Sequence, residues 1–176
     1  RRSPTTSRLV VLGVAAAIAM TAPGKAQSPL EHDAYIWQRS WRPPLLESIA
    51  ANKDLVRSWR VLAAQVSPTG KLMPVTAETR ALAESGRPLV MVVRIDGQLP
   101  NFDQIRLLDQ VLNLHQQWRD QGLAIAGLEI DHDCGTAKLP GYAKFLVQMR
   151  SRLDLGTQLS ITALPAWISS RHLADV

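Results

Sequence analysis

The 176-residue sequence contains a single cysteine, Cys134, which excludes an intramolecular disulfide framework. The folded part must therefore be held together by its own hydrophobic core, and about 150 residues suffice for one such core. Short-period repeats and low-complexity segments are also missing. The sequence is thus that of an ordinary globular domain rather than a disulfide-rich scaffold.

No apolar run is long enough to cross a membrane as a helix, which takes about 20 residues. The longest run, residues 9–20, has 12 residues and follows a start that holds three arginines. Gly24 and Ala26 then have the spacing that a signal peptidase prefers. We therefore predict a signal peptide over residues 1–26, a periplasmic or secreted protein, and no stable membrane insertion after cleavage.

A large excess of one charge is missing once that segment is set aside. The whole chain has 20 lysines and arginines against 15 aspartates and glutamates. Residues 1–26 hold four of the basic residues and no acidic ones, which leaves 16 against 15. Because the remaining chain is almost neutral, its charge gives no evidence for nucleic-acid binding.

Strand and helix patterns alternate along residues 27–176. Apolar segments bounded by turn residues predict strands, and apolar residues at helical spacing predict helices between them. The predicted strands are 33–38, 59–67, 88–97, 123–133 and 157–167, and the predicted helices are 43–54, 76–85, 102–122 and 140–153. Residues 67–74 are predicted to be a loop. Thr76 is expected to cap the second helix, and Gly122 to end the third.

Strand–helix units that recur about every 30 residues indicate an α/β fold with a parallel sheet. Two architectures fit: a complete doubly wound sheet, and the N-terminal part of a (β/α)8 TIM-type barrel with about five strand–helix units. A whole barrel needs about 250 residues. The chain starts with Arg1 rather than methionine and stops where a further helix would begin. We therefore favour a partial barrel over residues 27–176, truncated at its C-terminus.

The stretch GLEIDHDCG, residues 127–135, places three carboxylates in a segment that otherwise has the composition of a core strand. Glu129, Asp131 and Asp133 alternate, and alternate side chains of a strand share one face. In a barrel, the carboxyl ends of strands face the active site. The Cα atoms of Asp131 and Asp133 should lie about 6.6 Å apart, which suits the carboxylate pairs of glycoside hydrolysis. Crowding should keep one of the three acids protonated, as a general acid requires.

The ends of the other predicted strands supply further polar and aromatic side chains. Such groups around an acidic mouth suit sugar rings, which stack on aromatics and present hydroxyls. The candidate substrate-binding residues are Trp37, Gln65, Arg94, Asp96, Thr162 and Trp167. Four of these residues also have a structural interpretation, since Arg94 can pair with Asp96 and the two tryptophans can cap the core. His132 should point away from the aspartates that flank it, so neither a metal nor a cofactor is predicted.

Four segments resemble the bacterial domain-of-unknown-function 3142 family, and the resemblance extends over nearly all of the chain after residue 26. They are YIWQRSW, RVLAAQV, GLEIDHDCGTAKLPGYAKFLVQMRSRL and LSITALPAW. The acidic strand has a weaker resemblance to the chitinase-like family 18 glycoside hydrolases, whose fourth barrel strand ends in D-x-x-D-x-D-x-E. That resemblance implies that Asp133 is the proton donor and Asp131 its modulator. The sequence departs from the pattern in having Asp133 in place of Glu and Glu129 in place of Asp.

We therefore predict an exported carbohydrate-active protein of glycoside-hydrolase type that acts on a polysaccharide or oligosaccharide. Two alternatives stay open. The first is a barrel that binds glycans without cleaving them. The second is a metal-dependent hydrolase of another class, such as a phosphodiesterase, in which the same acids are metal ligands.

Overall fold

The computed structural model describes residues 30–97 and 104–176, so the predicted signal peptide lies outside the described residues. The unit Glu31–Val176 is compact. Its strands are β1 (Asp33–Ile36), β2 (Ser58–Val66), β3 (Leu72–Pro74), β4 (Leu89–Ile95), β5 (Ile125–His132) and β6 (Gln158–Ile161). Its α-helices are α1 (Pro43–Asn52), α2 (Thr79–Glu84), α3 (Gln104–Asp120) and α4 (Leu139–Arg152). None of the helices in the two described ranges is long and apolar enough to cross a membrane.

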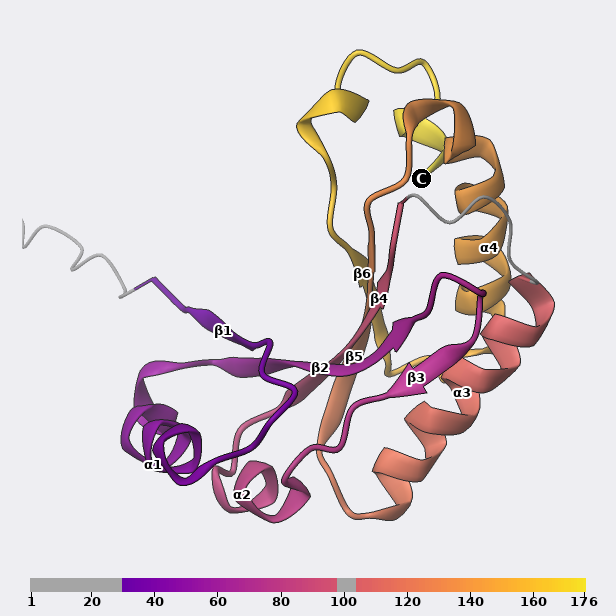
Figure 1. Cartoon of the computed structure of the whole chain (residues 1–176). Coiled ribbons are helices and arrows are strands. Elements are labelled where there is room, and N and C mark those ends of the chain that lie inside the picture. Colours follow the sequence, from indigo (N-terminus) through magenta and orange to yellow (C-terminus); the bar gives the residue numbers. More distant parts are fainter. Residues whose placement is uncertain (1–29, 98–103) are drawn as a thin grey trace, which may run out of the picture. The chain divides into compact units, whose positions relative to one another are not determined.

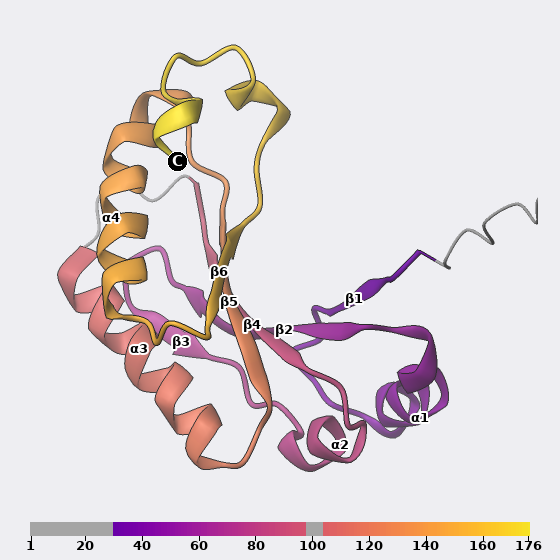
Figure 2. The same ribbon diagram turned by 180° about the vertical axis from the view of Figure 1, so that it is seen from behind.

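Five of the strands stand in the order β1-β2-β4-β5-β6, and each pair of neighbours runs parallel. This order follows the sequence without a reversal, whereas a doubly wound sheet reverses at a switch point. Figures 1 and 2 show the four α-helices along one face of the sheet, as right-handed crossovers between successive strands require. The predicted α/β fold with a parallel sheet is therefore confirmed, and the doubly wound alternative does not fit the topology.

The strand β3 lies within the segment that the sequence analysis predicted to be a loop. It pairs antiparallel with Ala64 to Val66 of β2, on the edge that β1 uses at Ser58 to Val61. Gly70 turns this hairpin with a φ of 79°, a conformation that glycine adopts without strain. Because β3 pairs with the last residues of β2, the backbone groups of β2 on that edge are not available to the chain that follows β1.

Two predicted boundaries are wrong. Helix α2 starts at Thr79, with Glu78 rather than Thr76 at its N-cap position. Strand β6 ends at Ile161, and Pro165–Trp167 forms a 3₁₀ turn, η3, instead of the end of a strand. Proline favours the first turn of a helix and has no N–H for a sheet ladder, which explains the early end of the strand.

The core lies between the sheet and its helices. On β5, Leu128 and Ile130 are fully buried on the helix side, where the Tyr142 hydroxyl of α4 donates to the Ile130 carbonyl at 3.2 Å. Full burial of each such aliphatic side chain contributes about 2 kcal/mol. The alternation of the strand turns Glu129 and Asp131 to the opposite face. The fold thus presents the acidic side chains on the face that the helices leave open.

Candidate active site

Polar side chains of neighbouring strands form a row across the open face. Gln65 of β2 is in register with Arg94 of β4, and Arg94 is in register with Asp131 of β5. Thr162, just after β6, donates from its hydroxyl to Oδ1 of Asp131 at 2.5 Å. Neighbouring strands are about 4.8 Å apart, so the row spans about 14 Å. Four residues proposed from the sequence are therefore brought together by three neighbouring strands and the residue that follows β6.

Arg94 bridges two of the three candidate catalytic carboxylates. Its Nη1 donates to Oδ2 of Asp131 at 2.5 Å, and its Nη2 donates to Oδ2 of Asp133 at 2.7 Å. Burial alone would lower the pKa of Arg94, but the hydrogen bonds and charges of the two aspartates raise it. The Asp131 side chain is 6% exposed and that of Asp133 is 38% exposed, so Asp133 is the one open to a ligand.

Close backbone packing fixes the position of Asp133. A Cβ atom added to Gly97 would lie 1.6 Å from the carbonyl oxygen of Asp133 and 2.5 Å from its carbonyl carbon. Backbone atoms cannot rotate away as the end of a flexible side chain can. Glycine at position 97 is therefore required for the chain after β4 to approach Asp133 this closely.

Glu129 lies one pleat deeper and has all its contacts within the protein. Its Oε1 accepts a hydrogen bond from the Tyr35 hydroxyl at 2.9 Å, and its Oε2 accepts from Arg60 and from the Ser160 hydroxyl. The Glu129 side chain is 3% exposed. This geometry favours a supporting role for Glu129, although the sequence analysis grouped it with the catalytic acids.

Tyr35, Arg60 and Asp33 belong to this cluster and were not singled out from the sequence. Arg60 pairs with Glu129 and also donates from Nη2 to Asp33 at 2.9 Å. Burial and the hydrogen bond to Glu129 raise the pKa of Tyr35 to about 12. One signal was available, because Arg60 is the one charged residue of the largely buried strand β2 and a buried charge needs a partner.

The remaining predicted residues divide between the open face and the core. Trp37 stacks on Tyr35 with ring centroids 5.5 Å apart and is 38% exposed, as a sugar-contacting residue would be. Trp167 is 1% exposed, and its Nε1 donates to the Cys134 carbonyl at 2.8 Å. Its assignment to substrate binding is therefore wrong, because η3 turns the indole into the core against α4. His132 also faces α4, where it contacts the edge of Tyr142, so it points away from the aspartates as predicted.

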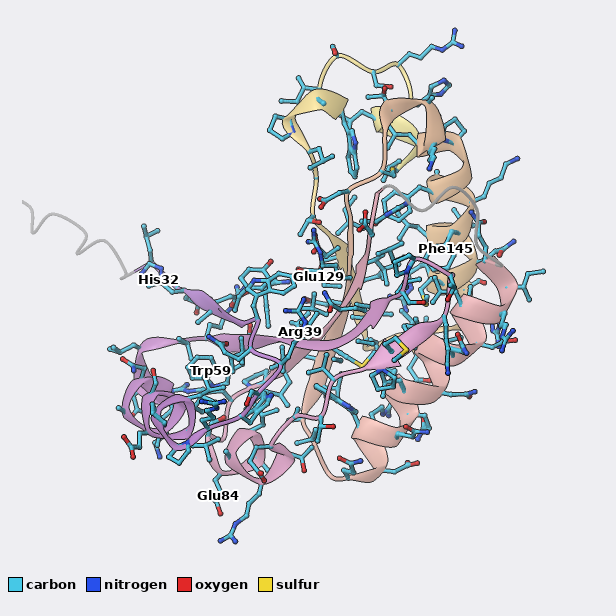
Figure 3. All side chains as sticks on the ribbon, in the orientation of Figure 1. His32, Arg39, Trp59, Glu84, Glu129 and Phe145 are labelled. Carbon is cyan, nitrogen blue, oxygen red and sulfur yellow. The ribbon has the colours of Figure 1, made fainter. Side chains whose placement is uncertain are left out.

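A cavity of about 260 Å³ opens beside the row, at the carboxyl ends of β2 and β4. It is lined by residues 65–68, Met73, Arg94 and Asp96. At its edge, Nε of Arg39 donates to Oε1 of Gln65 at 2.8 Å. Figure 3 labels Arg39 and Glu129, which lie toward the middle of the sheet on its open face.

A larger hollow of about 940 Å³ lies at the opposite, amino ends of the strands, where Pro88 and Thr157 help to line it. Its charged side chains Arg119 and Asp154 pair with each other, and it holds none of the predicted site residues. The chemistry of the carboxylates, rather than the size of the hollow, therefore identifies the candidate site.

Comparisons with solved structures find enzymes in which part of the chain has a similar fold. The structure is similar to that of the spore cortex-lytic enzyme SleL of Bacillus cereus, with 15% identity and a TM-score of 0.59. It is also similar to SleL of Bacillus megaterium QM B1551, with 17% identity and a TM-score of 0.55. Each likeness covers 76% of this chain but only 35% of the enzyme, so the chain spans about a third of either. At such identities the likeness shows the fold alone.

No curated protein matches the sequence. The family model described as "Domain of unknown function (DUF3142)" matches residues 85–176, which is more than half of the chain. The matched segment contains β4, β5 and β6 and with them Arg94, Asp131 and Asp133. The chain therefore belongs to the DUF3142 family.

Proposed function

We propose that this protein is an exported, carbohydrate-active protein of glycoside-hydrolase type, built on the N-terminal part of a (β/α)8 barrel. The uninterrupted strand order and the placement of all four α-helices on one face support the barrel. The fold likeness to two spore cortex-lytic enzymes supports a glycan as the partner.

The observation that carries the proposal is the pair of carboxylates at the carboxyl end of β5. Asp131 is almost fully buried, and its carboxylate accepts hydrogen bonds from Arg94 and Thr162. Asp133 is partly exposed and pairs with the same arginine. Its proposed role is that of proton donor to the leaving oxygen of a glycosidic bond, and Asp131 is its modulator.

Arg94 has to loosen its contact with Asp133 for this chemistry. A carboxylate that accepts a hydrogen bond from a guanidinium is held in its ionised form, and a general acid must carry a proton. A ligand that draws Arg94 away would free the Asp133 carboxyl from the guanidinium and leave it open to the oxygen of a glycosidic bond. We therefore propose two roles for Arg94: it binds the substrate, and its movement releases the Asp133 carboxyl.

The test uses the full-length protein with a panel of chitin-type and bacterial cell-wall glycans, and it measures released reducing ends. Asp133→Asn should abolish cleavage, since an amide cannot donate the proton, while circular dichroism shows an intact fold. Asp131→Asn should lower the rate and shift the pH optimum, because the neighbouring charge is removed. Full turnover by the Asp133→Asn protein on a glycan that the wild type cleaves would refute the assignment.

One observation favours a second candidate, a protein that binds glycans without cleaving them. Arg94 holds both aspartates in the ligand-free geometry, and a site that never releases Asp133 would bind but not hydrolyse. Binding of a glycan without any release of reducing ends would support this alternative. The metal-dependent alternative has less support, because residues 30–97 and 104–176 hold no group of three His, Cys, Asp or Glu side chains suited to a metal ion.

A further inference from the structure

We propose that Arg39 makes this protein selective for glycans that carry a carboxylate, and that it binds this group beside the acidic residues. The inference rests on the proposed function and names the substrate class. The site consists of Tyr35, Trp37, Arg39 and Gln65, which we call the Arg39 site. These residues belong to β1, to the chain that follows it and to the carboxyl end of β2. In barrels, the carboxyl ends of the strands and their loops bind the substrate.

Arg39 is an exposed arginine of the open face that has no carboxylate partner (Figure 3). Its Nε donates to Oε1 of Gln65, which is neutral, at 2.8 Å. Within residues 30–97 and 104–176, no aspartate or glutamate forms an ion pair with it, whereas Arg60 and Arg94 on the same face both pair with buried acids. The positive charge of Arg39 is therefore available to an anionic ligand.

The contact with Gln65 orients the guanidinium of Arg39. It engages Nε and leaves Nη1 and Nη2, which together form the end of the planar group. Two parallel N–H groups of this kind match the two oxygens of a carboxylate. Because the side chain is already held, less ordering is needed when a ligand binds. The geometry therefore favours a carboxylate over a hydroxyl group at this position.

An aromatic pair lies two residues before Arg39 in the chain. The rings of Tyr35 and Trp37 stack with an angle of 5° between their planes, and the two residues are 43% and 38% exposed. Glu129 holds the Tyr35 hydroxyl, and Arg60 matches the charge of Glu129. Ligand sites combine such apolar surface with a few placed polar groups. The pair can contact the face of a sugar ring whose carboxylate binds Arg39.

The unpaired acids of the open face lie away from the Arg39 site. The strand order places Asp96, after β4, and Asp131, on β5, on the side of β2 opposite to β1. Gln65 and Asp131 are two strand spacings apart, about 10 Å, which is one Debye length at 0.1 M salt. Repulsion of a bound carboxylate is therefore weak. A disaccharide spans this distance, so a glycan at Asp133 can present a neighbouring unit to Arg39.

The experiment measures calorimetric binding of two matched pairs of oligosaccharides to the full-length protein. The first pair is tetragalacturonate and its methyl ester, which differ in a hexuronic carboxylate. The second is a peptide-free tetramer of alternating N-acetylglucosamine and N-acetylmuramic acid and the N-acetylglucosamine tetramer, which differ in a lactyl carboxylate. The wild type should bind the acidic member of at least one pair about tenfold more tightly, and this preference should shrink with added salt. The pair that shows it identifies the source of the carboxylate.

Variants of the arginine test whether the preference arises at this site. Arg39→Gln should abolish the preference and leave the affinity for the neutral member unchanged. Arg39→Lys should keep part of it, because an ammonium retains the charge but not the two parallel donors. The matched control is Arg80→Gln on α2, which removes the same charge at an arginine that is 83% exposed and pairs with Glu84. It should keep the whole preference.

Reducing ends are measured in parallel, so the results separate the Arg39 site from the proposed hydrolysis. Equal binding of acidic and neutral members, or a preference that Arg39→Gln keeps, overturns the Arg39 site even if the wild type cleaves glycans. A preference that Arg39→Gln loses, without any release of reducing ends, supports the Arg39 site and overturns hydrolysis. Failure of the wild type to bind any of the four oligosaccharides refutes the Arg39 site as stated here.

Discussion

Removal of the Arg60 charge should destabilise the protein through the carboxylate it leaves behind. Glu129 is 3% exposed, and Arg60 is the positive charge that contacts it. In Arg60→Met a side chain of similar length keeps much of the packing, but the Glu129 carboxylate stays buried with only Tyr35 and Ser160 as hydrogen-bond donors. Breaking a buried ion pair in this way costs about 3–5 kcal/mol. Because Arg60 is 19% exposed and water can reach its place, we expect about 3 kcal/mol.

Urea denaturation of the full-length protein measures this cost as a fall in the free energy of unfolding. The double variant Arg60→Met/Glu129→Gln should recover about 1–2 kcal/mol relative to the single one, since an amide is cheaper to bury than a lone carboxylate. The matched control is Arg57→Met. Arg57 also pairs with Asp33 but is 56% exposed, so its loss should cost less than about 1 kcal/mol. Equal costs for the two arginines, or a double variant less stable than Arg60→Met, would refute the reasoning.

Three further predictions follow from the same structure. Gly97→Ala should lower turnover of any cleaved glycan at least about a hundredfold, because the added Cβ must move the Asp133 backbone by more than about 1 Å. The control Gly156→Ala, where nothing lies within 4 Å of the added Cβ, should leave turnover unchanged. Burial alone would raise the pKa of Asp33, but hydrogen bonds from arginines and a serine lower it to about 2. Its ionised form therefore contributes about 2 kcal/mol above pH 5, and the stability difference between wild type and Asp33→Asn should shrink as the pH falls toward 2. Mass spectrometry of the exported protein should show Gln27 as its first residue, and an uncleaved cytoplasmic product would contradict the signal peptide.

The acidic strand β5 shows what a local sequence pattern can predict. Alternation of side chains is fixed by the backbone of a single strand, so the sequence placed Glu129 and Asp131 on one face and His132 on the other. The structure has this arrangement. Periodicity also located all four α-helices, and Gly122, with a φ of 78°, follows the third of them as predicted.

Sequence reasoning failed where a residue's neighbours come from distant parts of the chain. Trp167 was expected at the mouth of the site, but a proline turn places its indole in the core. The short strand β3 was missed because three residues, the last of which is Pro74, give too weak a pattern to distinguish from a loop.

The sequence by itself determined the alternation of strands and helices and the common face of the acids, because both depend on dihedral geometry within one element. Only the tertiary structure decided which side chains those acids meet. Arg60 reaches Glu129 across 69 residues of sequence, and Arg94 reaches Asp133 across 39. These contacts depend on the order and register of parallel strands, which follow from the packing of the whole sheet against its helices. The close approach of Gly97 to the Asp133 backbone has the same origin, since two separate strand ends must first be brought side by side.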